Sequence, residues 1–390
     1  MKQNSKNENT ALILREPSEL EKIIFKLVRG FGGFVNYHAH FDRAFTTAKR
    51  YMEHCGVNPL HAVSMPLSIK QILTGELHKG PAYEPKDLYA RIERCLKLSI
   101  HTGTREAVSF IDATPDIGLK AIEIAAELRE KYRGKIDFKI AAHPIFGFKE
   151  DAAHKMSRWE VFVNACNMAD IIGALPEKDA RADSIGFDVH MRNILELGAV
   201  LNKEVHIHVG QANDPEQNDV LEAIEAVRWI VGEPKSENEN PKVWFIHAIS
   251  PSAYPEHKFR KVLEGLKRYN IGVVCCPKAA ITMLQLRSVE SPTHACIARV
   301  LEMALFGIKL RLGTDNISDM FISSSSGSMV DEVITLSDNI RFANPLVLAK
   351  LAAGADLNLS DKEIIRRHLE EYRKALLRAN LNFEFCIPLE

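Results

Sequence analysis

The chain has 390 residues, enough to bury one large α/β core or two ordinary domains. Its 50 basic and 51 acidic residues leave a net charge of −1, which argues against nucleic acid or an anionic membrane surface as a partner. The polar N-terminus, the lack of a CxxC pair and the lack of an apolar run of about 20 residues predict a cytoplasmic protein without a membrane-spanning helix.

Short β-rich runs alternate with helical periodicity along most of the chain. An amphipathic helix is predicted at residues 19–28. Strands are predicted at residues 34–40, 107–113, 137–144, 170–176, 204–210, 243–249, 271–277 and 309–315, and helices between them at 117–132, 188–201, 217–231, 255–269 and 295–306. Eight such units in parallel can close on themselves, so we predict an α/β fold of the (β/α)₈ barrel type.

The remaining segments are expected to decorate this barrel. We expect residues 1–30 to form an N-terminal segment and helix, residues 31–342 the barrel, and residues 343–390 a C-terminal helical extension. An insertion at residues 51–85, rich in Pro, Gly and His, is expected to lie over the barrel mouth as a lid or substrate loop. Ser360 and Glu363 are predicted to form a capping box for a helix that runs through Leu377.

Histidines and an aspartate recur at the ends of predicted strands. His38 and His40 share one strand face, and His208, His247 and Asp315 follow at later strand ends. The HxH pattern alone is a weak signal, but a parallel barrel brings all strand C-terminal ends to one face. Imidazoles with a carboxylate suit zinc or iron, and such a metal lowers the pKa of bound water toward about 7.

These residues lie in motifs that resemble the amidohydrolase superfamily, in particular its cytosine deaminase-like branch, to which the adenosine deaminases are related. The motifs are HAHFD at 38–42, HVGQANDPE at 208–216, the strand carrying His247, CCPKAAITM at 275–283 and LGTDN at 312–316. The resemblance implies one divalent ion, zinc or alternatively iron, bound by His38, His40, His208 and Asp315. It implies that His247 polarises the attacking water or the substrate. Because only 33 residues precede the first predicted strand, little or no β-sandwich domain is expected.

Three positions depart from the family pattern. Gln211 stands where the deaminases have a glutamate that shuttles protons; glutamine keeps the hydrogen bonds but cannot transfer a proton. Asn316 stands where cytosine deaminases often have a second aspartate, and Ile145 where they have a pyrimidine-reading glutamine. Cytosine and adenosine are therefore not expected as substrates. The catalytic candidates are His247, Asp315 and Gln211.

Further candidates surround this group, each with a structural alternative. The residues assigned to substrate binding are Asp42, Arg43, His143 and Asn316. Arg43 could instead form a structural ion pair, and His143 could be a hydrogen-bonded loop histidine. Lys178 stands where binuclear relatives place a carboxylated lysine; a solvated lysine is the alternative, and we predict one metal. His206 is expected one layer deeper than His208, as a core histidine.

The sequence thus predicts a metal-dependent amidohydrolase that cleaves a carbon–nitrogen bond other than a peptide bond. The bond would belong to an amide, a cyclic amide or an amino-substituted heterocycle, and a metal-activated water would attack it. One alternative is an aminohydrolase (deaminase) that releases ammonia from a heterocyclic amine; another is a non-catalytic metal-binding relative. We expect a small-molecule substrate and no nucleic-acid or membrane partner; a homo-oligomer is left open.

Overall fold

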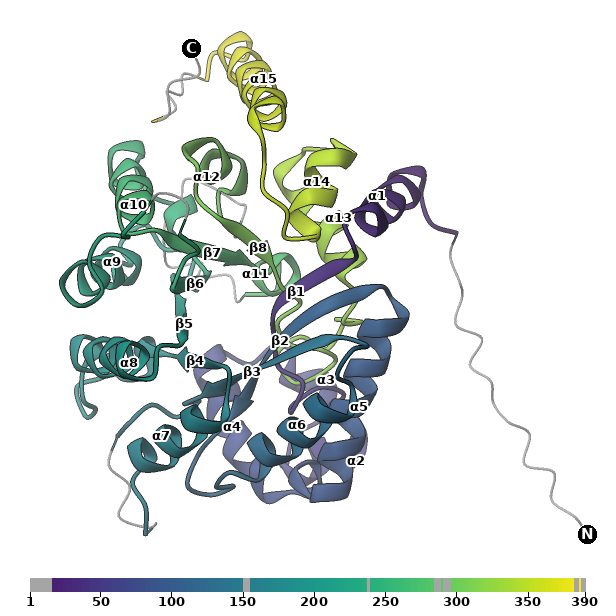
Figure 1. Cartoon of the computed structure of the whole chain (residues 1–390), viewed down its shortest axis with the longest axis vertical. Helices are drawn as coiled ribbons and strands as arrows, with labels where there is room; N and C mark the ends of the chain where they lie inside the picture. The colour runs from purple at the N-terminus through teal and green to yellow at the C-terminus, as the bar shows by residue number, and fades with distance from the viewer. Residues whose placement is uncertain are drawn as a thin grey trace, which may run out of the picture.

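Eight parallel strands form the centre of the molecule, in the order β1 to β8. The computed structural model describes residues 16–149, 155–236, 239–283, 289, 296–381 and 386 (Figure 1). The strands are β1 (Phe34–Ala39), β2 (Thr104–Asp112), β3 (Asp137–His143), β4 (Ile171–Ala174), β5 (Glu204–Val209), β6 (Val243–His247), β7 (Ile271–Cys275) and β8 (Leu310–Leu312). A parallel bridge between Ala39 and Asp315 joins the first strand to the end of the last, so the (β/α)₈ barrel prediction is confirmed.

Helices connect consecutive strands and surround the sheet, as Figure 1 shows. The connecting helices are α5 (Pro85–His101), α6 (Lys120–Lys131), α7 (Arg158–Met168), α8 (Phe187–Leu201), α9 (Asp219–Ile230), α10 (Glu256–Arg268), α11 (Pro277–Ile281) and α12 (Val300–Phe306). Helix α1 (Glu19–Gly30) precedes β1 and packs on α14 (Pro345–Ala352). The predicted segment 1–30 is described only from residue 16, and residue 295, the predicted start of α12, lies outside the described residues.

The insertion after β1 is helical, whereas its Pro, Gly and His content suggested a loop. It contains α2 (Lys49–His54), α3 (Pro59–Ala62), α4 (Leu67–Lys79) and the short 3₁₀ turn η1 (Pro81–Tyr83). Most of its prolines and glycines stand at helix boundaries, for example Pro66 before the first turn of α4 and Gly80 after its last, and only Gly75 lies inside a helix of the insertion. A Cβ at Gly80 would lie 2.3 Å from the His54 ring, so glycine there allows α2 and α4 to approach each other.

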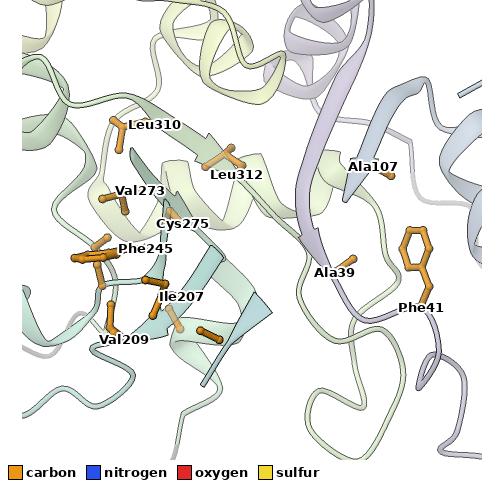
Figure 2. Packing of buried hydrophobic residues seen from close by; sticks show 14 of the residues in the cluster. Ala39, Phe41, Ala107, Ile207, Val209, Phe245, Val273, Cys275, Leu310 and Leu312 are labelled. Carbon is orange, nitrogen blue, oxygen red and sulfur yellow. The ribbon is translucent and has the colours of Figure 1, made fainter. Parts of the chain in front are cut away.

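Strand side chains alternate between two apolar layers. The outer layer packs between the strands and the helices, and Figure 2 shows part of it, including Ile207, Val209, Phe245, Val273, Cys275, Leu310 and Leu312. The inner layer fills the barrel and includes Phe110, Trp244 and Ile246. Because Ile207 and Val209 lie in the outer layer, His206 and His208 face the barrel interior.

The helix after the barrel, α15 (Leu359–Arg378), begins with a different capping box from the predicted one. The Asn358 side chain accepts a hydrogen bond from the backbone N–H of Asp361 at 3.0 Å, and the Asp361 carboxylate accepts one from the backbone N–H of Asn358 at 2.8 Å. The predicted pair of Ser360 and Glu363 was therefore wrong by two residues, since the extended residue that begins the helix is Asn358. Among the described residues, no helix is both long and apolar enough to cross a bilayer.

Candidate metal centre

Five side chains from four strand ends meet inside the barrel mouth. His38 Nε2 lies 3.2 Å from His208 Nε2 and 3.4 Å from Asp315 Oδ1. His40 Nε2 lies 3.2 Å from Asp315 Oδ1, and His247 Nε2 lies 3.8 Å from Asp315 Oδ2. These residues form two overlapping groups, His38 with His208 and His247, and His38 with His40 and Asp315. Within each group the possible ligand atoms lie within 4.8 Å of one another, and all five residues are buried. The structure thus brings together the side chains that the sequence predicted to converge.

The backbone at this point is tightly constrained. The N–H of Asp315 donates to the carbonyl of His38 at 2.9 Å, and the N–H of His40 donates to the carbonyl of Asp315 at 3.2 Å. A Cβ at Gly313 would lie 2.7 Å from the His38 carbonyl oxygen, so only glycine permits this approach. His247 and Asp315 adopt left-handed φ values of 76° and 55°, which cost on the order of 1–3 kcal/mol each in non-glycine residues. Such strain is concentrated at functional sites.

The protonation states of these groups suit metal binding. Burial lowers the pKa of His247 to about 4, and burial with the neighbouring histidines holds the pKa of His208 well below its usual value. Burial alone would raise the pKa of Asp315, but the rings of His38 and His40 hold it well below the usual range. Neutral imidazoles and an ionised carboxylate are the forms that bind metals.

Hydrogen bonding agrees with this assignment. His208 Nδ1 lies 3.1 Å from the Ala174 carbonyl oxygen, which fixes the proton on Nδ1 and leaves the Nε2 lone pair facing the other candidates. Asp315 Oδ1 is buried and receives no well-aligned hydrogen bond from the described residues, so the polar atoms beside it are the ring nitrogens of His38 and His40. A nitrogen-rich set with one carboxylate fits zinc or iron rather than calcium or magnesium.

The cluster borders a cavity of about 620 Å³, within the range of small-molecule sites. His40, His208, His247 and Asp315 line it, and so do residues of the helical insertion, among them Val63 and Lys70. Lys70 Nζ donates to the carbonyl oxygens of Val63 and Phe321 at 3.2 and 3.3 Å. This ammonium therefore ties the insertion to the segment after β8 across the mouth.

A buried charge network lies beside the cavity and includes three substrate-binding candidates, two of which reach the cavity wall. Arg43 lines the cavity and forms an ion pair with Asp112 at 3.2 Å, and His143 Nδ1 lies 2.7 Å from the same carboxylate. Asp42, in contrast, is not brought to the cavity wall: its carboxylate accepts hydrogen bonds from the Asp112 N–H at 2.8 Å and the Tyr83 hydroxyl at 3.0 Å. The geometry gives Asp42 a supporting place in this network.

The other candidates divide between the cavity and its surroundings. His143 Nε2 has no hydrogen-bond partner and the residue lines the cavity; Asn316 also lines it and donates to Asp319 at 2.6 Å. Lys178 Nζ donates to Gln71 at 3.0 Å and borders a separate depression. His206 pairs with Glu204 at 3.3 Å, deeper in the barrel and apart from the metal-ligand candidates.

One acidic residue of the cavity was missed by the sequence reasoning. Glu177 belongs to η2 (Pro176–Lys178), which directly follows β4, and it lines the cavity beside Gln211. Gln211 Nε2 donates to Glu177 Oε2 at 2.9 Å. The available signal was its position three residues after the last residue of β4, Ala174, because strand C-terminal ends carry barrel active sites.

No protein-family profile matches the chain. A protein of Haemophilus influenzae, described only as uncharacterized, is 29% identical over 250 residues, which span 64% of this chain and 83% of that protein.

Solved structures give a broader likeness. The 5-methylcytosine deaminase of Klebsiella pneumoniae, liganded with 5-fluorocytosine, has a TM-score of 0.67 at 18% identity, over 86% of this chain and 82% of that one. The N-isopropylammelide isopropylaminohydrolase of Burkholderia multivorans has a TM-score of 0.61 at 17% identity with the same coverages, 86% and 82%. The atrazine chlorohydrolase of Arthrobacter aurescens, complexed with zinc, has a TM-score of 0.55 at 14% identity over 83% of this chain and 70% of that one. The chain therefore has the barrel fold of this deaminase, this aminohydrolase and this chlorohydrolase.

Proposed function

We propose that this chain is a metal-dependent hydrolase that cleaves a carbon–nitrogen bond, other than a peptide bond, in a small molecule. The observation that carries the proposal is the convergence of four buried imidazoles and one carboxylate, of which three imidazoles and the carboxylate line a cavity large enough for such a substrate. His38, His40, His208 and Asp315 would hold one divalent ion, zinc or alternatively iron. When bound, such an ion lowers the pKa of water so that hydroxide is available near neutral pH.

The chain's own residues supply the remaining chemistry. Asp315, ionised at neutral pH, accepts the proton of the attacking water. His247, which is neutral because its pKa is lowered to about 4 by burial, donates a hydrogen bond to the oxygen on which negative charge develops. His143 Nε2, Arg43 and Asn316 offer polar contacts that orient the substrate in the cavity.

Two finer features belong to the same proposal. One metal is favoured over two, because Lys178 donates to Gln71 and borders a different depression from the histidines. A cytoplasmic protein acting on a small molecule, without a nucleic-acid or membrane partner, agrees with the near-zero net charge.

A second candidate is an aminohydrolase that releases ammonia from a heterocyclic amine. It is favoured by the fold shared with the 5-methylcytosine deaminase, whereas the isopropylaminohydrolase, named for removing a substituted amine, favours the first. Gln211 favours the first candidate, because a carboxamide cannot carry the proton that a glutamate would carry at that position.

The test combines metal analysis with turnover. Purified protein is loaded with zinc or iron, and its metal content is measured by elemental analysis. It is then assayed against amides, cyclic amides and heterocyclic amines, with ammonia and primary amine products quantified separately. One equivalent of metal and release of a substituted amine or an opened amide support the first candidate; ammonia supports the second. Stoichiometric metal without turnover of any compound would identify a non-catalytic relative.

A further inference from the structure

The wall of the cavity beside Gln211 holds a carboxyl group from a different strand. Glu177 receives two hydrogen bonds from Gln211: the side-chain Nε2 donates to Oε2 at 2.9 Å, and the backbone N–H donates to Oε1 at 3.4 Å. Both residues line the cavity that His40, His208, His247 and Asp315 also line. A carboxyl group therefore lies within one hydrogen bond of the position where the glutamate is missing.

Its surroundings identify which acid holds the proton. The Glu177 carboxyl lies beside that of Asp219, and Gln217 Nε2 donates to both, to Glu177 Oε1 at 3.4 Å and to Asp219 Oδ2 at 3.2 Å. Asp219 also accepts from two backbone N–H groups, those of Gly210 at 2.6 Å and Val220 at 2.9 Å, whereas the one backbone N–H bonded to Glu177, that of Gln211, lies at 3.4 Å. The donors to Asp219 stabilise negative charge on its carboxylate. Burial raises the pKa of both carboxyls, but the backbone donors oppose this rise at Asp219, whereas the neighbouring Asp219 carboxylate adds to it at Glu177, whose pKa lies well above its usual value. Glu177 is therefore the protonated member of the pair at neutral pH.

We propose that Glu177 is a catalytic residue that delivers a proton to the departing nitrogen, doing from the end of β4 what a glutamate at position 211 does in the deaminases. This rests on the proposed function. As the new carbon–oxygen bond forms, the attacking water gives one proton to Asp315. As the carbon–nitrogen bond breaks, the nitrogen keeps the bonding electron pair and takes the proton of the Glu177 carboxyl. Glu177 then takes up a proton from solvent and Asp315 releases one, which closes the cycle.

Gln211 acts in this scheme as a positioning residue. Its carboxamide cannot donate a transferable proton, but its N–H groups hold the Glu177 carboxyl at the cavity wall. Exchanging the two side chains would keep an acid and an amide in contact while moving the acid to position 211. The variant with the two side chains exchanged is therefore the control for loss of the acid.

The experiment compares metal-loaded wild type with E177Q and the exchanged double variant E177Q/Q211E. In E177Q we expect kcat to fall by about 10²-fold or more, with KM and metal content near those of wild type, because a proton carrier is lost while the hydrogen-bonding shape is kept. The loss should shrink for a substrate whose departing nitrogen depends less on protonation, such as a nitroanilide, because the nitro group withdraws electron density from that nitrogen. The exchanged variant should recover a large part of kcat. A purely structural role would give equal losses for all substrates and no recovery.

A second readout does not depend on turnover. The infrared difference spectrum of wild type minus E177Q at neutral pH should contain the carbonyl stretch of a carboxylic acid, because protonated carboxyls that both proteins share, such as Glu332 with its pKa raised to about 8, cancel in the difference. The proposal would be overturned if E177Q had the same kcat as wild type, or if the carbonyl band of the carboxylic acid were the same in both proteins. If the wild-type protein turns over no compound, the proposed function fails and the proton-delivery role fails with it, while the infrared band still decides whether Glu177 holds a proton.

Discussion

Two histidines on the same strand, His206 and His208, have different neighbours. Both are buried and face the barrel interior, but His208 Nε2 lies against His38, whereas His206 pairs with Glu204. The two-residue period of a strand gives them the same face, and their depth along the barrel axis separates their roles. They form a natural matched pair for mutation.

We expect H208Q to bind less than one tenth of the metal that wild type binds under the same loading conditions, because glutamine lacks the imidazole lone pair that would contact the ion. H206Q should keep one equivalent, since its side chain lies outside the ligand group. Elemental analysis of folded, gel-filtered protein measures both. Full metal content in H208Q would remove this histidine from the ligand set.

The sequence predicts the residues of this site that lie at strand ends, but not those whose position depends on tertiary packing. His38, His40, His208, His247 and Asp315 were predictable because each ends a recognisable strand and a parallel barrel gathers strand ends. Glu177 also follows a strand end, but this signal was weak, because β4 is a short four-residue strand and Glu177 lies in a Pro-Glu-Lys stretch that is typical of a solvated loop. Its burial beside Gln211 and Asp219 depends on tertiary packing that no local pattern encodes.

At the scale of elements, the helical insertion after β1 is the part that the sequence predicted least well. Its position at the mouth followed from its place in the chain order, but its helices did not follow from its composition. Helix α4 reaches across the mouth and is joined to the segment after β8 through Lys70. This contact gives the insertion the geometry of a cover.

We expect K70M to raise KM about tenfold and to speed proteolysis within the insertion. The methionine keeps most of the buried side-chain volume but removes two charge-assisted hydrogen bonds, each worth about 1.5–3 kcal/mol. K79M is the control, because Lys79 is on the same helix but pairs only with the nearby Glu76. Steady-state kinetics and limited trypsin digestion report the effect; equal behaviour of the two variants would exclude a latch at Lys70.

The start of α15 offers a test of the corrected cap. N358A should lower the free energy of unfolding by about 1 kcal/mol, since it leaves the Asp361 N–H without its acceptor. S360A should change it by much less, because Ser360 lies inside the first turn of the helix. Urea unfolding followed by circular dichroism measures both. The reverse order of effects would restore the pair of Ser360 and Glu363 as the cap.

At the scale of the whole molecule, the metal candidates join the two ends of the sheet. His38 and His40 belong to β1 or its end, Asp315 follows β8, and the bridge between Ala39 and Asp315 closes the barrel. We call this contact between β1 and the residues after β8 the seam of the barrel. An ion held by both ends of the sheet would stabilise the folded state against separation of the two sides of the seam.

Removal of the metal should therefore lower Tm. At a free metal concentration of 100 times Kd, binding contributes about 2.7 kcal/mol to the free energy of unfolding, so chelation should lower Tm by several degrees. Calorimetry before and after treatment with a chelator, followed by re-addition of zinc, measures the change and its reversal. An identical Tm with and without metal would show that the seam is held by its backbone hydrogen bonds alone.

The same seam sets an order of events during synthesis. The histidines of β1 leave the ribosome long before Asp315, which cannot pair with Ala39 until nearly the whole barrel has been translated. A nascent or truncated chain that ends before residue 315 thus carries exposed imidazoles but no closed coordination shell. If these residues hold an ion as proposed, the complete ligand set exists only in a chain that has passed residue 315, and a chain that ends earlier offers the histidines without the carboxylate.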